Sequence, residues 1–157
     1  MQQTKEQTFA RWGFYLLGMV LLALGLTLNT KTGLGASAIV SVPFTVSQTT
    51  GWYFGNLTLV VYCLFVAAQF VIKGKKWRWT DLLQIPLSIV FTRFLNIFGA
   101  VIPYKSGNLP ADLALLVAAI LLTGVGAAMT VDMQLIPNPG DGIVSAISQV
   151  SGRELGF

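Results

Sequence analysis

Four long apolar runs alternate with short polar segments along the chain. They cover residues 12–28, 56–72, 82–102 and 113–129. As α-helices, all four are long enough to cross the roughly 30 Å hydrocarbon core of a bilayer. A fifth segment, residues 36–49, is shorter and is interrupted by serine, threonine and proline. The pattern predicts an all-α, polytopic membrane protein.

A break rich in glycine or proline follows the first and the last of these runs. Residues 29–35 (Asn-Thr-Lys-Thr-Gly-Leu-Gly) form the first break, and residues 136–142 (Ile-Pro-Asn-Pro-Gly-Asp-Gly) form the second. Glycine, proline and clustered polar residues are unfavourable inside a helix. A short helix is expected after each break. The envelope of the first, residues 35–50, would extend roughly 24 Å, which is marginal for a full crossing.

The chain repeats itself after about a hundred residues. Residues 47–55 recur as residues 148–156, with serine, glutamine and both glycines at a constant offset of 101 positions. Gly25 in the first run and Gly126 in the last have the same offset. Internal repeats that are each interrupted beside a short helix are typical of membrane transporters.

Just upstream of the repeated motif, the match shifts. Residues 37–41 resemble residues 141–145 at an offset of 104, and the extra residues make about one helical turn, which a helix absorbs as an insertion.

The sequence therefore divides into a polar segment (1–11), a first transmembrane repeat (12–103) and the start of a second repeat (104–157). We expect the second repeat to be truncated in this chain.

Positive charges predict the orientation. Residues 73–79 (Lys-Gly-Lys-Lys-Trp-Arg-Trp) carry four cations beside a span end, which predicts a cytoplasmic loop. If the short helices are re-entrant, the repeats are inverted, and seven Lys and Arg residues lie inside against two outside. If the short helices cross fully, the repeats are parallel and the count is five against four. The positive-inside rule favours re-entrant helices.

Composition excludes several classes of protein. Hydrophobic residues make up 54% of the chain and charged residues 10%, with a mean hydropathy of +0.70. A soluble domain of this length lacks the interior to hold so much apolar surface. The chain has no histidine and one cysteine, which excludes histidine-based metal sites, Ser-His or Cys-His nucleophiles and internal disulfides. We expect no enzyme activity, no cofactor and no nucleic-acid partner.

Two charged residues are the first candidates for a solute site. Asp141 lies at the mouth of the second short helix, where it could coordinate a cation or take up a proton, or could instead cap the helix. Arg93 lies within the third run, where a charge is costly. It could bind an anion or pair with Asp141, or could bond carbonyls of a break. We expect both residues to face the interior of the bundle.

Four uncharged residues complete the set of candidates. Asn138 lies in the second break and Asn96 in the third run, while Gln48 and Gln149 occupy equivalent places in the two repeats. Asn96, like Gln84, could instead form hydrogen bonds between helices. Gln48 and Gln149 could line a symmetric site, or could form hydrogen bonds with the free backbone groups at the end of a short helix.

Two features concern packing. Pro86 is expected to kink the third long helix, because proline frees the carbonyl of Leu82. The small residues 124–128 (Gly-Val-Gly-Ala-Ala) predict a face for close contact with another helix.

Short glycine motifs carry a resemblance to a known family. They are Gly33-Leu34-Gly35, Thr50-Gly51 with Gly55, Pro139-Gly140-Asp141-Gly142, and Ser151-Gly152 with Gly156. With these motifs the chain, from about Trp12 onward, resembles the YczE/YyaS/YitT family of bacterial integral membrane proteins. The resemblance implies a location in the bacterial cytoplasmic (inner) membrane and a repeat architecture, and names no substrate. Ala36-Ser37-Ala38 stands where other members carry an acidic residue, which speaks against a two-carboxylate site.

The sequence predicts transport of a small solute or ion, bound at the interface between the two repeats. The alternative is a non-transporting membrane partner that stabilises or regulates another protein complex. Transport predicts polar residues that converge near the middle of the membrane, whereas the partner role predicts a dry core. The lipid bilayer is the expected surrounding, and a homo-oligomer remains open.

Overall fold

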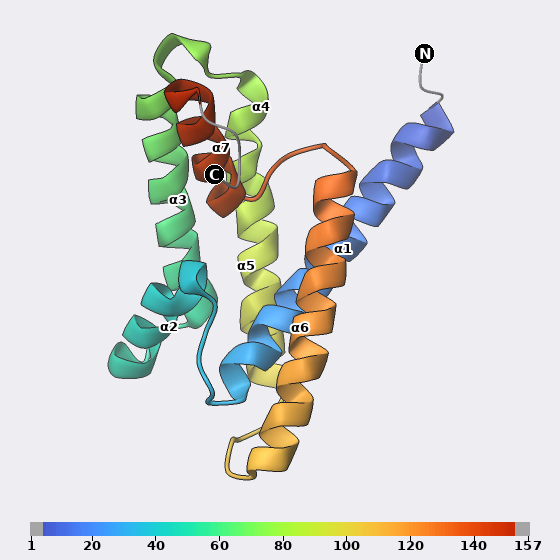
Figure 1. The fold of residues 1–157 in the computed structure, drawn as a ribbon, viewed down its shortest axis with the longest axis vertical. Coiled ribbons are helices and arrows are strands. Elements are labelled where there is room, and N and C mark those ends of the chain that lie inside the picture. The colour runs from blue at the N-terminus through green and yellow to red at the C-terminus, as the bar shows by residue number, and fades with distance from the viewer. Residues whose placement is uncertain (1–4, 153–157) are drawn as a thin grey trace.

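A computed structural model describes residues 5–152 of the 157-residue chain. Within this range the regular structure is entirely helical, as the sequence predicts (Figure 1). The second half of the repeated motif, residues 153–156, lies outside the described residues. The helices are α1 (Lys5–Lys31), α2 (Ala38–Thr50), α3 (Phe54–Lys73), the 3-10 turn η1 (Gly74–Lys76), α4 (Trp79–Leu82), α5 (Gln84–Val101), α6 (Leu109–Asp132) and α7 (Pro139–Ser151).

Four of the described segments are long and apolar enough to cross a membrane. They are Thr8–Lys31, Phe54–Lys73, Trp79–Val101 and Leu109–Asp132. Each segment contains one of the four runs predicted from the sequence and extends it by a few residues. The exception is the end of the third run, because the predicted run includes Ile102 and the helical segment ends at Val101. Large apolar side chains cover their outer faces, as lipid contact requires. α1 begins at Lys5, so the predicted boundary after residue 11 falls inside a helix.

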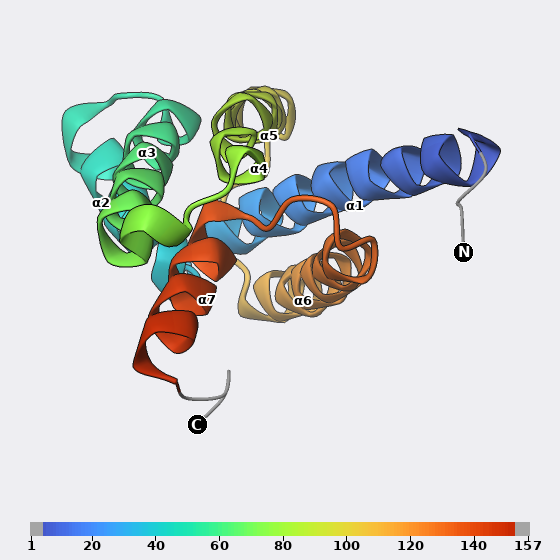
Figure 2. The ribbon, with the colours of Figure 1, turned by 90° about the horizontal axis from the view of Figure 1, so that it is seen from above.

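The long helices alternate in direction. In Figure 1, α1 and α5 run downward while α3 and α6 run upward. α1 therefore ends, and α3 begins, toward the lower end of the molecule, although α2 lies between them in the sequence. α7 turns back toward the upper end, where α6 ends. Figure 2 shows that α1 runs obliquely past the other long helices.

α1 and α6 form the most extensive helix pair, and small residues bring them together. A Cβ atom on Gly126 would lie 2.5 Å from the backbone nitrogen of Leu22 and 2.7 Å from the carbonyl oxygen of Gly18. The predicted small-residue face is confirmed at Gly126. A Cβ on Gly124 would meet nothing within 4 Å, so Gly124 is not part of the contact.

The same contact occurs a second time with the two helices exchanged. A Cβ on Gly25 would lie 2.7 Å from the backbone nitrogen of Thr123 and 2.9 Å from the carbonyl oxygen of Ala119. Gly25, Thr123 and Ala119 are the residues that stand 101 positions from Gly126, Leu22 and Gly18. The α1–α6 seam therefore contains two matching contacts, formed by the same backbone atoms of corresponding residues.

The offset of 101 also holds for the ends of the helices. α1 ends at residue 31 and α6 at 132, and the 13-residue helices α2 and α7 begin at 38 and 139. The structure therefore places the two breaks at residues 32–37 and 133–138, rather than at 29–35 and 136–142. The insertion expected between residues 37–41 and 141–145 is therefore wrong. The residues before the two helices, Ser37 and Asn138, have nearly the same backbone angles (φ −57°, ψ 143° and φ −58°, ψ 143°). Because of this common geometry, both helices begin at matching positions. The similar segments 37–41 and 141–145 therefore lie at different places in their helices, the first at the start of α2 and the second about one turn into α7.

The third span is interrupted close to Pro86. α4 ends at Leu82 and α5 begins at Gln84, so Leu83 separates them. Because Pro86 has no N–H to bond the carbonyl of Leu82, the helical hydrogen-bond ladder fails at this point, as expected. Before it, Lys73 and Asp81 form an ion pair of 3.0 Å that ties the end of α3 to the start of α4.

The hydrophobic core lies where α1, α3, α5 and the second break meet. Its buried members are Tyr15, Met19, Ala23, Leu26, Val40, Tyr62, Phe91, Leu95 and Ile136. Polar side chains interrupt this core beside the second break, and these side chains form the candidate site.

Candidate functional site

A buried pair of glutamines joins α3 to α5. Gln69 and Gln84 exchange two amide hydrogen bonds of 3.1 Å each, and each residue is 1% exposed. Gln69 Nε2 also donates to the carbonyl oxygen of Pro139 at 3.3 Å. A Cβ on Gly142 would lie 2.7 Å from Gln69 Oε1, so a glycine there lets the first turn of α7 approach the pair. The amides thus connect two spans to the second short helix.

The second break is also held from α1. The Tyr15 hydroxyl donates to the carbonyl oxygen of Ile136 at 2.9 Å, and both residues are buried. One turn earlier, the Arg11 guanidinium donates to the carbonyl oxygen of Met133, just beyond α6. A cation at the C-terminal end of a helix also interacts favourably with the helix dipole. Two side chains of α1 therefore satisfy backbone carbonyls that the break leaves without helical partners.

Asn138 caps the short helix α7. Its Oδ1 accepts a hydrogen bond of 3.2 Å from the backbone N–H of Gly140, and its Nδ2 donates to the Tyr62 hydroxyl at 3.4 Å. The interpretation of Asp141 as the capping residue is therefore wrong, since Asp141 lies within the first turn. Asparagine is among the preferred residues at a helix N-terminus because its side chain reaches the free N–H groups there.

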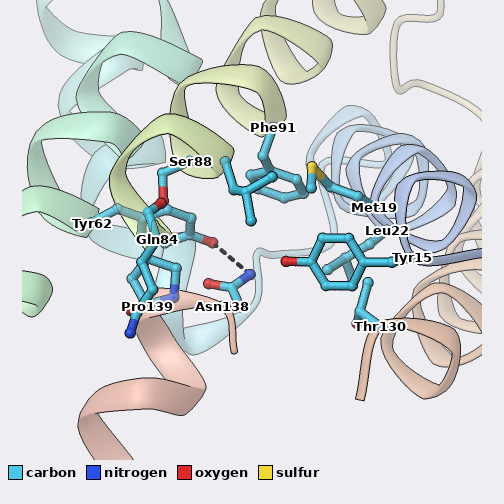
Figure 3. A pocket seen from close by; sticks show the side chains of 11 residues that line it. Tyr15, Met19, Leu22, Tyr62, Gln84, Ser88, Phe91, Thr130, Asn138 and Pro139 are labelled. Carbon is cyan, nitrogen blue, oxygen red and sulfur yellow. Dashed lines mark hydrogen bonds between the residues drawn. The ribbon is translucent and has the colours of Figure 1, made fainter. Parts of the chain in front are cut away.

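A small cavity of about 30 Å³ lies at the centre of these contacts (Figure 3). It has room for about one or two water molecules. The Tyr15 hydroxyl points toward Asn138 in this view. Among the described residues that line the cavity, none is charged. They are Tyr15, Met19, Leu22, Tyr62, Gln84, Leu87, Ser88, Phe91, Thr130, Asn138 and Pro139.

Asn138 and Asp141 come together at a second, larger hollow of about 280 Å³. It lies between the end of α6 and the first turns of α7, and Ser145 and Gln134 also line it. Asp141 is exposed and lies in the first turn of α7. Asn138 lines both this hollow and the central cavity, so it stands between them.

Gln48 and Asn96 line a different hollow, of about 300 Å³, at the opposite end of the molecule. Asn96 Oδ1 accepts a hydrogen bond of 2.8 Å from the Gly55 N–H, and Asn96 Nδ2 donates to Asn56 Oδ1 at 3.1 Å. Asn96 is therefore a hydrogen-bond partner between α5 and α3, as one interpretation proposed. Lys31 lines the same hollow and donates to the carbonyl oxygen of Gly99 at 2.9 Å.

The expectation that Arg93 and Asp141 face the interior and meet is wrong for the described chain. Arg93 is exposed on α5, and the ion pair recorded within residues 5–152 joins two other residues, Lys73 and Asp81. The buried positions of α5 are 84, 88, 91, 92 and 95, which follow the helical period and leave position 93 on the outer side. Gln149 is also exposed, and its Nε2 donates to Ser145 Oγ at 3.3 Å.

Sequence reasoning missed Tyr15, Tyr62 and Gln69. Each is a polar side chain inside an apolar run, where such groups are uncommon and need a partner. Tyr62 and Gln69 are seven positions apart, so they lie on one face of α3. That spacing was the available signal, although it does not identify the partners on α5 and in the second break.

Comparisons with known proteins agree with a membrane assignment. Residues 9–157 match the family of unknown function DUF6198. Over 150 residues the chain is 25% identical to the uncharacterized membrane protein YczE of Bacillus subtilis (strain 168), which covers 94% of this chain and 67% of that protein. No solved structure matches the chain. The expected resemblance to YczE-like membrane proteins is confirmed, and the chain belongs to the DUF6198 family.

Proposed function

We propose that this chain forms part of a membrane transporter that moves a small solute or ion between two inverted repeats, each with a re-entrant helix. One contact carries the proposal. A Cβ on Gly140 would lie 3.0 Å from Ile39 Cδ1, so the first turns of α2 and α7 meet. Ile39 and Gly140 are themselves 101 positions apart. Corresponding residues that touch each other lie at a two-fold axis.

The α1–α6 seam supports inversion of the repeats. Corresponding residues of these antiparallel helices make the same contacts in exchanged roles, at Gly25 and at Gly126. An exchange of this kind requires a two-fold axis perpendicular to the helix pair. If both helices cross the bilayer, that axis lies near the membrane plane, as in transporters with inverted repeats.

The direction of the chain supports re-entrant short helices. α1 ends and α3 begins toward one end of the molecule, and α6 and α7 both end toward the other (Figure 1). Irregular backbone at membrane depth is tolerated where it is buried in protein or lines a cavity. In the second break, side chains of α1 and α3 satisfy the carbonyls of Met133, Ile136 and Pro139, which fits this requirement.

The polar side chains suggest the path of the solute. Transporters with interrupted helices bind their substrates near the membrane midplane, where the short helices begin. Here the central cavity joins hydroxyl and amide groups, and Asn138 and Asp141 line a hollow on one side of it. Gln48 and Asn96 line a hollow at the opposite end. We assign no transport role to Arg93 or Gln149, which are exposed and line none of these three hollows.

Flux through reconstituted vesicles tests the proposal. The whole chain is incorporated into liposomes, and stopped-flow light scattering follows urea and glycerol while a potential-sensitive dye follows sodium and chloride. We expect at least one probe to cross faster than through protein-free vesicles. Asn138→Leu should remove the excess flux, because it places an apolar side chain between the cavity and the hollow. Thr80→Leu, at an exposed residue that lines none of the three hollows, should retain it. Equal rates with and without protein would favour the non-transporting alternative.

A further inference from the structure

The two breaks differ in how they are held, although they correspond in position. Tyr15 and Arg11 of α1 donate hydrogen bonds to the carbonyls of Ile136 and Met133 in the second break. If the repeats were fully symmetric, residues 101 positions further along, in α6, would hold the first break in the same way. Those residues are Leu116 and Asp112.

Neither of these residues can replace its counterpart. Leu116 lines a hollow of about 210 Å³ with Gly35, which is the counterpart of Ile136, but its side chain has no hydrogen-bond donor. The Asp112 carboxylate accepts hydrogen bonds from the Tyr104 hydroxyl at 2.7 Å and from Ser106 Oγ at 3.0 Å. Asp112 thus fixes the loop before α6, and the side chains that hold the second break have no equivalent at the first.

Hydrogen bonding within the first break is local. The Leu34 N–H bonds the Thr32 hydroxyl at 3.2 Å, and the Ser37 carbonyl accepts from the Val40 N–H at 3.0 Å. Among residues 5–152, no recorded hydrogen bond joins a carbonyl of residues 32–37 to another helix. The end of α1 itself is held, because Lys31 donates to the carbonyl oxygen of Gly99. Within the described residues, the backbone that no other helix holds by a hydrogen bond therefore begins after α1, where a Cβ on Gly33 would lie 2.9 Å from Ser106 Oγ in the loop before α6.

The backbone chemistry of the two breaks differs in the same direction. In the first break, Gly33 (φ 70°) and Gly35 (φ 137°) adopt angles that are open to glycine, and both are exposed. At the second break, Pro137 and Pro139 restrict their φ angles. Each break contains one buried residue, Thr32 (0% exposed) in the first and Ile136 (5% exposed) in the second, so the difference lies in the backbone. Glycine increases the number of accessible backbone conformations and proline reduces it.

We propose that Arg11 and Tyr15 are positioning residues that fix the second break, while the first break, residues 32–37, is the part that moves when solute passes. The proposal rests on the transport function proposed above. It assigns unequal roles to the two re-entrant segments. α7 provides a fixed wall with Asn138 and Asp141, and the start of α2 moves against that wall at the Ile39–Gly140 contact.

Hydrogen–deuterium exchange of the whole chain in lipid nanodiscs tests this inference without a transport assay. In the unmodified protein, we expect the amides of residues 32–37 to exchange faster than those of 133–138. Tyr15→Phe should speed exchange in 133–138 by about 2- to 10-fold, since one hydrogen bond contributes about 0.5–1.5 kcal/mol, and should leave 32–37 unchanged. Tyr53→Phe is the matched control, because Tyr53 is 70% exposed, and should change neither segment.

A second variant adds the missing donor to the first break. Leu116→Tyr places a hydroxyl in the hollow beside Gly35 and should slow exchange in residues 32–37 by about 2- to 10-fold. It should also slow solute flux. Leu113→Tyr, on an exposed position of the same helix, should do neither.

The outcomes separate the two proposals. Equal exchange at the two breaks in the unmodified protein, or a Tyr15→Phe effect as large at 32–37 as at 133–138, would overturn the inference. A failure of Leu116→Tyr to slow the first break in a folded protein would also count against it. If the exchange results are as expected but no probe crosses the vesicles, the difference between the breaks stands and the transport function fails.

Discussion

The α1–α6 seam and the polar interior between α3, α5 and α7 hold the same bundle together by opposite means. In the seam, Gly25 and Gly126 let backbones touch because no side chain intervenes. In the interior, Gln69 and Gln84 bridge the helices with long side chains whose amides satisfy one another. The seam packs backbone against backbone, whereas the interior buries polar side chains that bond one another. We infer that the seam maintains the fold and that the interior provides the residues specific to function.

The largest effect is expected in the seam, from Gly126→Leu. The new Cβ would lie 2.5 Å from the Leu22 backbone nitrogen, so α1 and α6 must separate. Overpacking costs about 1–3 kcal/mol and occasionally more, and we expect a loss at or above the upper end of that range. Thermal unfolding in detergent measures it. Gly124→Leu is the control, because nothing lies within 4 Å of its Cβ position. Equal unfolding temperatures for the two variants would contradict the contact.

The next largest effect is expected at the buried glutamines. Gln69→Leu leaves the Gln84 amide without its partner, which costs about 1–3 kcal/mol. In a double variant, Gln84→Leu removes the orphaned group as well, so the combined loss should be smaller than the sum of the single losses. Strict additivity of the three unfolding free energies would show that the two amides do not interact.

A smaller effect is expected at Asn138. Asn138→Ala removes the helix cap at α7 and should reduce stability by about 1 kcal/mol. Asn138→Ser introduces the residue found before α2, where Ser37 stands, and retains an oxygen that can accept from Gly140. It should recover most of the loss. The unfolding temperatures of the two variants test this, and an Asn138→Ser variant as unstable as Asn138→Ala would argue against a capping role.

The smallest effect is expected at Arg93. Since Arg93 is exposed on α5, Arg93→Gln should change stability by no more than about 0.5 kcal/mol and leave solute flux intact. Flux measurements on vesicles containing this variant provide the check. A complete loss of flux with normal folding would return Arg93 to the solute site.

Hydrophobic length predicted the spans well, because each run is long enough to span a bilayer only as a helix. The repeated glycines also predicted corresponding helix ends, since Gly51 and Gly152 both adopt left-handed angles that close a helix (φ 73° and 68°). Whether Arg93 points inward or outward depends on which face of α5 is buried. The buried polar residues Gln84, Ser88 and Thr92 mark that face, and Arg93 does not lie on it. The Gln69–Gln84 pair depends on how two helices are placed in space, and the sequence of each helix alone does not contain that information.

The account depends most on both short helices returning to the side from which they enter, one from each side of the membrane. Single cysteines replace Leu34, Thr50, Asp132 or Ser151 in a chain whose native Cys63 is changed to alanine, and intact cells are treated with an impermeant maleimide. We predict that the cysteines at Leu34 and Thr50, which bracket α2, react from outside. Those at Asp132 and Ser151, which bracket α7, should react only after the cytoplasmic side is opened. Reaction of Leu34 and Thr50 from opposite sides would mean that α2 crosses the membrane and would contradict the inverted, re-entrant arrangement.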